Sequence, residues 1–101
     1  MPRPTPLTEE EVKKIVLNSI VSRTFKYSNH LFDRVEERNL SVHDVSYICQ
    51  NGKLVAPEWN TERLEWRYPL QCKALDGIET AVFLKIPEDQ YYVVAVTIFS
   101  Y

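Results

Sequence analysis

Apolar residues recur at helical spacing through the first half of the chain and predict three helices. The first begins at Thr8, the opening residue of a capping box, and ends near Val21. Ser28 is a suitable N-cap for the second helix, over residues 29–38. The third covers about residues 42–50. Each helix has one apolar face, which must pack against another layer of the fold.

Beyond the third helix the hydrophobic period falls to two, which predicts strands. Asn51–Gly52 ends that helix, with the glycine available for a left-handed cap. The predicted strands cover residues 53–56, 64–74, 80–86 and 91–101. Short turns between strands favour an antiparallel meander. We therefore predict an α+β fold, in which N-terminal helices pack on one face of a small antiparallel β-meander of about four strands.

The alternation also predicts the direction of individual side chains. The face that packs against the helices is expected to hold Trp66, Tyr68, Leu70, Val94, Val96 and Ile98. Pro69 interrupts this alternation and indicates an edge position or a bulge. Residues 22–27 are predicted to be a connector, and residues 57–63 a polar loop that carries Trp59.

Length and composition fit one domain. The chain has 101 residues and is 45% hydrophobic, so it can bury a core. Three alternating prolines mark residues 1–7 as a flexible tail and residues 8–101 as the domain. No apolar run is long enough to span a membrane, and the start of the chain lacks the apolar stretch of a signal peptide. We expect a cytoplasmic protein with no membrane association.

Neither cysteine suggests a cofactor or a metal. Cys49 and Cys72 have apolar neighbours and are predicted to be reduced core thiols. The two cysteines and two histidines show no paired ligand spacing of the C-x-x-C type. No metal and no organic cofactor is therefore expected.

One polar pattern stands out on the second helix. His30, Arg34 and Arg38 follow one another at intervals of four residues and form a stripe beside the apolar face. The chain has a net charge of −2 and a pI of about 5.7, which opposes nucleic-acid binding unless a few cations form a local patch.

The stretch SNHLFDRVEERNLSVHDVSYICQNGKLV, with the terminal VVAVTIFSY, resembles the bacterial domain-of-unknown-function family 4258. The matching features are His30, Arg34, Arg38, the Asp44–Val45 pair and Gly52. The resemblance covers about residues 27–101. Asn39 stands where a glycine is usual, but asparagine also tolerates the left-handed conformation.

That family looks like a relative of the BrnT and RelE group of small toxins, which are ribonucleases neutralised by an antitoxin protein. The resemblance implies a toxin-like domain that binds RNA and can cleave it without a metal. His30 would be the acid or base, because its ordinary pKa lies near neutrality. Arg34 and Arg38 would hold phosphate oxygens.

Further contacts with RNA are predicted outside the stripe. Arg67 and Lys73 lie on the polar side of a strand and would add positive charge. Trp59 is a candidate for a partner contact, and Tyr101 for stacking on a base.

Two other interpretations compete with the ribonuclease. Acids at helical spacing, such as Glu37, would make the stripe a set of surface ion pairs that hold helix to sheet. The chain would then be a non-catalytic protein–protein interaction module of the same fold. A combined interpretation has an exposed aromatic sheet face that binds an antitoxin-like protein or a second copy of the chain.

Overall fold

A computed structural model describes residues 4–89 and 92–100. The fold is α+β, with three helices and a mixed sheet. The helices are α1 (Glu9–Val21), α2 (Asn29–Glu37) and α3 (Val42–Asn51), each within a few residues of its prediction. The strands are β1 (Phe25–Tyr27), β2 (Lys53–Leu54), β3 (Glu58–Asn60), β4 (Glu65–Lys73), β5 (Glu79–Lys85) and β6 (Val93–Ser100).

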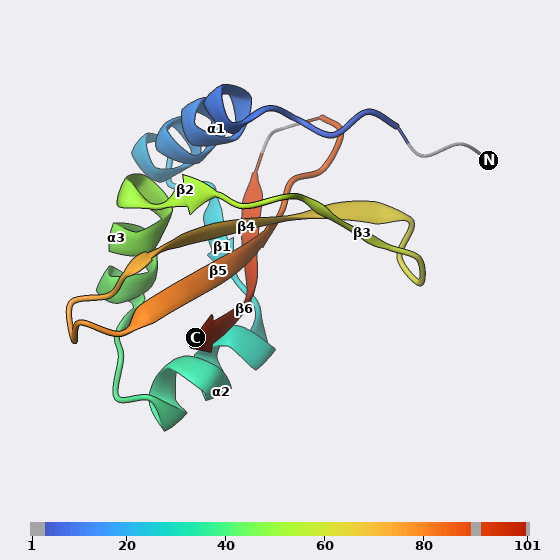
Figure 1. The fold of residues 1–101 in the computed structure, drawn as a ribbon. Helices are drawn as coiled ribbons and strands as arrows, with labels where there is room; N and C mark the ends of the chain where they lie inside the picture. The colour runs from blue at the N-terminus through green and yellow to red at the C-terminus, as the bar shows by residue number, and fades with distance from the viewer. Residues whose placement is uncertain (1–3, 90–91, 101) are drawn as a thin grey trace.

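The sheet order is β1-β6-β5-β4-β2, and β3 also pairs with β4. Strands β4, β5 and β6 are antiparallel neighbours, as the meander predicted. Figure 1 shows α1 and α3 together against the sheet, while α2 lies apart from them, at the C-terminal end of β6. No helix within the described residues is long and apolar enough to cross a membrane.

The predicted connector over residues 22–27 is wrong for its second half. Phe25–Tyr27 forms β1, which pairs in parallel with Val93–Ala95 of β6 and makes the sheet mixed. Arg23 turns the chain into this strand with a φ of 59°. Three residues are too few to show a period, so the strand owes its existence to the edge of β6.

The predicted polar loop over residues 57–63 is also wrong in part, because Glu58–Asn60 forms β3. Strand β3 pairs with residues 65–67 of β4, whereas β2 pairs with residues 70–71. Pro69 lies between these two pairings, and its carbonyl accepts a hydrogen bond from the Val55 amide at 3.0 Å. Its missing N–H therefore costs no ladder hydrogen bond, which explains a proline within a long strand.

The core lies between the helices and one face of the sheet. Its most deeply buried members come from every helix and from three strands, and they include Val12, Val16, Leu31, Val45, Ile48, Cys49, Leu70, Val82, Leu84, Val93 and Ala95. Val94 and Val96, predicted on this face, are only partly buried; Val93 and Ala95 take their places. The reason is a register shift in β6, where Phe83 pairs with Thr97 but Leu84 pairs with Ala95. The irregularity falls at Val96, and such a bulge reverses the alternation along a strand.

Helix α3 is connected to its surroundings through its C-terminus. Gly52 has a φ of −74°, so the predicted left-handed cap is wrong. A Cβ at position 52 would lie 2.6 Å from the Ile48 carbonyl oxygen, which explains the glycine by close approach of the backbone. Lys13 of α1 donates to the carbonyls of Gln50 and Gly52 at 2.7 Å each, where a cation suits the helix dipole.

Two turns have the left-handed backbone conformation at the residues where the sequence predicts it. Asn39 follows α2 with a φ of 56°, and Gly77 forms the β4–β5 hairpin turn with a φ of 84°. Ser41 and Asp44 begin α3 as predicted, with the Ser41 amide donating to the Asp44 carboxylate at 2.7 Å. The predicted turn residue Gln90 and the predicted strand residues Tyr91 and Tyr101 lie outside the described residues.

Candidate functional site

The face of the sheet turned away from the core, called the open face below, carries the candidate site. Its members alternate with core residues along β4, β5 and β6: Glu65, Arg67, Pro69, Gln71, Lys73, Glu79, Ala81, Phe83, Lys85, Val94, Thr97 and Phe99. Phe83 and Phe99 are aromatic members of this face, packed edge-to-face with ring centroids 5.4 Å apart. Phe99 is 43% exposed.

A groove of about 380 Å³ lies at one end of the open face. Its walls include His30 of α2, Trp59 of β3, Arg67 of β4, and Phe83, Thr97 and Phe99 of the central strands. The groove therefore joins residues that are far apart in the sequence. The Thr97 hydroxyl oxygen is buried and, within the described part of the chain, has no hydrogen-bond partner.

His30 reaches this groove because the N-cap residue of α2, Ser28, is fixed to β6. The Ser28 amide donates to the Ala95 carbonyl at 3.0 Å, and the Ser28 hydroxyl donates to the Val96 carbonyl at 2.6 Å. The same hydroxyl caps the helix by accepting from the Leu31 amide at 3.0 Å. Leu31 is fully buried, so His30, one residue earlier, is left on the exposed side. Among the described residues no hydrogen bond or ion pair engages the His30 imidazole.

Arg34 continues the site one helical turn further on. Its guanidinium carbon lies 5.7 Å from the centroid of the Phe99 ring, within the range of a cation–π contact. It also pairs with Glu37 at 3.7 Å, as the helical spacing predicted, but its side chain stays 41% exposed. A smaller groove of about 220 Å³ lies between Arg34, Arg38 and Phe99. Phe99 is thus shared by both grooves.

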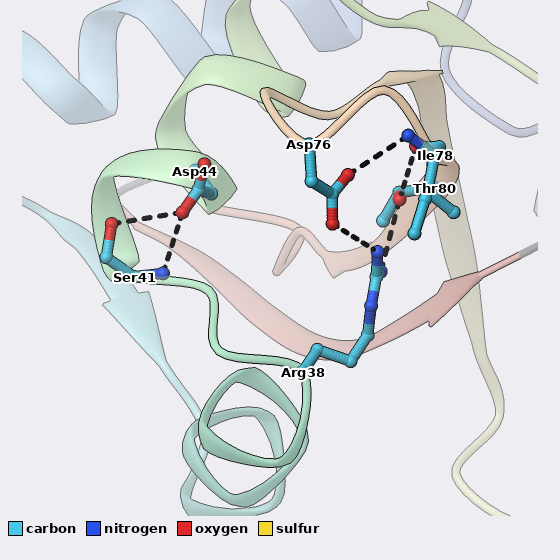
Figure 2. Close-up of polar contacts among 6 residues, drawn as sticks. All are labelled: Arg38, Ser41, Asp44, Asp76, Ile78 and Thr80. Atoms are coloured by element: carbon cyan, nitrogen blue, oxygen red, sulfur yellow. Dashed lines mark hydrogen bonds and ion pairs between the residues drawn. The ribbon is translucent and has the colours of Figure 1, made fainter.

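Arg38, the last member of the stripe, has a protein partner at each of its two terminal guanidinium nitrogens. It donates to the Thr80 hydroxyl at 3.1 Å and pairs with the Asp76 carboxylate at 3.3 Å. Figure 2 shows the side chain reaching from the end of α2 to the β4–β5 hairpin, where Asp76 also accepts from the Ile78 amide. Arg38 therefore attaches α2 to the sheet.

The predicted contacts outside the stripe separate into two groups. Arg67 lines the groove, forms an ion pair with Glu65, and burial lowers the pKa of its guanidinium. Trp59 lines the groove too, with its ring packed edge-to-face on Trp66 at 5.3 Å. Lys73 lies at the far end of β4, exposed and paired in register with Glu79. Tyr101 lies outside the described residues.

Sequence reasoning missed Phe83, Phe99 and Thr97. The last strand is apolar at nearly every position, so its outward residues do not stand out in the sequence as members of a site. The bulge at Val96 reverses the side chains before it, so that Val93 and Ala95 are buried, whereas Ile98 stays in the core as predicted and leaves Thr97 and Phe99 on the open face. No local pattern in the sequence places Phe83 and Phe99 in one groove with His30.

Comparisons of the chain with protein-family models, with curated protein sequences and with solved structures find no significant match. Within the described residues no group of three or more histidine, cysteine, aspartate or glutamate side chains is arranged to hold a metal ion. Function has to be inferred from the side chains of the open face.

Proposed function

We propose that the protein binds single-stranded RNA across the open face and cleaves it by metal-independent acid/base chemistry, as a cytoplasmic toxin-like protein. The observation that carries this proposal is the placement of His30, Arg34 and Arg67 around the exposed ring of Phe99. The arrangement of helices against a sheet is compatible with a BrnT- or RelE-like fold, and that assignment is part of the same proposal.

Aromatic residues on an open sheet face suit unpaired bases. Every base has a π-face, so an exposed aromatic ring stacks on it with little sequence preference, contributing about 1–3 kcal/mol per base. Phe99 offers such a ring, and Phe83 supports it from the neighbouring strand. The duplex is a poorer ligand because its bases are already stacked on one another.

The cations near Phe99 suit the backbone of the same strand. Arg34 has a half-exposed guanidinium that can donate to a phosphate oxygen. Its ion pair with Glu37, at 3.7 Å, is weak enough for a phosphate to replace the carboxylate. Arg67 adds a second guanidinium across the groove. Arg38 supports them by fixing α2, and Lys73 lies too far along β4 to join this groove. Binding by so few cations should be weak and sensitive to salt.

His30 is the group with acid/base chemistry near neutral pH in this groove. As a base, its imidazole nitrogen would take the proton of a ribose 2′-hydroxyl while that oxygen attacks the adjacent phosphorus. The bond from phosphorus to the 5′-oxygen then breaks, leaving a cyclic phosphate and a 5′-hydroxyl that receives a proton from water or from the imidazolium. Arg34 would stabilise the extra negative charge on the phosphate oxygens.

The test uses end-labelled single-stranded RNA with the full chain in excess chelator. Wild type should produce fragments with cyclic phosphate ends, and His30→Ala should lower the cleavage rate by at least about a hundredfold. His43→Ala is the matched control, because His43 is also exposed and lies in the first turn of α3. Equal cleavage by a folded His30→Ala protein would remove the catalytic role.

A second candidate function is a protein–protein interaction module. The observation that favours it is a further exposed aromatic residue on α2, Phe32, which is 46% exposed beside Tyr27. Phe32 and Phe99 are both exposed apolar side chains on an acidic protein, which suits contact with an antitoxin-like protein or a second copy. Dimerisation that Phe32→Ser abolishes, in a protein with no affinity for RNA, would support this candidate.

A further inference from the structure

The N-terminal segment, Pro4–Leu7, is attached to two aromatic residues of β4. The Trp66 indole N–H donates to the Pro4 carbonyl at 2.7 Å. The Leu7 amide donates to the Tyr68 hydroxyl oxygen at 3.0 Å. Trp66 and Tyr68 belong to the face opposite the open face, and neither of them lines the candidate RNA groove.

The spacing of these two hydrogen bonds fits one kind of ligand conformation. Pro4 and Leu7 are three residues apart, and a polyproline II helix has about three residues per turn. Residues at that spacing lie on the same side of the helix. Such a segment makes no internal hydrogen bonds, so its backbone groups are free for indole and phenol partners.

The aromatic surface extends beyond the part that this segment covers. Trp59 packs edge-to-face on Trp66 with centroids 5.3 Å apart. A cavity of about 450 Å³ adjoins Pro4, Thr5 and Leu7, with Trp66, Tyr68, Ile86 and Pro87 among its other walls. Figure 1 shows the segment leaving α1 and running past the β5–β6 connection, which contributes Ile86 and Pro87. The cavity falls within the usual size of ligand sites, ~300–1,000 Å³.

We propose that Trp66, Tyr68 and the adjoining cavity form a binding site for proline-rich peptide segments, which the chain's own Pro4–Leu7 segment occupies. The occupant in the structure defines the chemistry of the partner: prolines flanking a small polar residue, with a carbonyl for the indole and an amide for the phenol three residues later. A segment from another protein would replace Pro4–Leu7 rather than add to it.

The test measures binding of an acetylated and amidated Pro-Thr-Pro-Leu-Thr peptide, the sequence of residues 4–8, to the full chain by calorimetry. In a Pro4→Gly/Pro6→Gly variant, the chain's own segment should occupy the site less tightly, because glycine gives the unbound segment more backbone freedom to lose. This variant should bind the peptide about tenfold more tightly than wild type, because the fraction of protein with an empty site rises.

Two conservative changes test the groups that hold the peptide. Trp66→Phe removes the indole N–H but keeps an aromatic ring, and Tyr68→Phe removes only the hydroxyl. Introduced into the glycine variant, each should weaken binding by about tenfold, the effect of one lost hydrogen bond. Far-UV circular dichroism checks that both proteins fold.

The matched control is an Ala-Thr-Ala-Leu-Thr peptide, which keeps length and charge but loses the fixed backbone of proline. It should bind the glycine variant at least tenfold more weakly. The proposal is overturned if the glycine variant binds no peptide at millimolar concentration, if both peptides bind equally, or if neither conservative change alters the affinity.

Discussion

At the level of single residues, Arg34 and Arg38 carry the same guanidinium group in different surroundings. Arg34 is half exposed above the ring of Phe99, with one long ion pair. Arg38 is only 18% exposed and has partners on two other elements. The sequence places both arginines on one stripe, but only the structure separates the ligand-binding candidate from the anchor.

This difference predicts unequal effects on stability. Arg38→Gln should lower the free energy of unfolding by about 1–2 kcal/mol, because the Thr80 and Asp76 groups lose a charged partner. Arg34→Gln should cost less than about 0.5 kcal/mol, as is usual for an exposed ion pair. Urea denaturation of both variants measures these losses in the free energy of unfolding. A smaller loss for Arg38→Gln than for Arg34→Gln would contradict the anchoring role.

The candidate site could be predicted from the sequence only on its helical side. His30 and Arg34 follow from the helical period and from the Ser28 cap. Phe99 was not singled out, because the last strand is apolar at nearly every position, although the predicted inward direction of Ile98 already turns Phe99 outward. Trp59 and Arg67 were identified, but nothing local in the sequence places them beside His30.

At the level of secondary-structure elements, the helices were predictable because their start signals are local. Thr8, Ser28 and Ser41 each precede a helix, as their capping chemistry indicates. Strands β1 and β3 were not predictable, because each has three residues and forms only when a distant strand supplies its partners. Among the described strands, β1 is the one whose parallel pairing makes the sheet mixed.

The connection from α3 to β2 gives a second prediction. Gly52→Ala places a Cβ against the Ile48 carbonyl and the backbone of Gln71, so the helix end and β4 must move apart. We expect a loss of about 1–3 kcal/mol in the free energy of unfolding. Gly77→Asn is the control, since a Cβ there meets open space and asparagine tolerates positive φ. The account of Gly52 fails if the two variants are equally stable.

At the level of the whole molecule, stability should fall at alkaline pH. Burial raises the pKa of the Cys49 thiol far above its ordinary value, and it also raises the pKa of Cys72. In the unfolded chain these thiols ionise near pH ~8.5. Above that pH the unfolded state loses protons that the folded state keeps, so the stability present at lower pH is lost as pH rises.

The size of this effect can be measured by urea denaturation at two pH values. Between about pH 7.5 and pH 9.5 the free energy of unfolding should fall by about 1–2 kcal/mol. Cys49→Ala should be less stable overall because it leaves a cavity, but its stability should depend less on pH in this range. An unchanged pH dependence in Cys49→Ala would assign the alkaline loss to other groups.

The acidic charge of the whole chain is the strongest physical argument against a nucleic-acid ligand. Locally, however, His30 and Arg34 of α2 and Arg67 of β4 lie around the ring of Phe99. The central claim is therefore that Phe99 and its surrounding cations bind single-stranded RNA.

The most direct test is the fluorescence anisotropy of a labelled single-stranded RNA titrated with the full chain at low salt. Wild type should bind, and Phe99→Ala should weaken binding by at least about fivefold through loss of stacking on one base. Tyr47→Ala is the matched control, since Tyr47 is also exposed but lies on α3. Saturable binding that Phe99→Ala weakens and Tyr47→Ala leaves unchanged is the predicted result. Absence of binding by wild type, or equal binding by wild type and a folded Phe99→Ala protein, would contradict it.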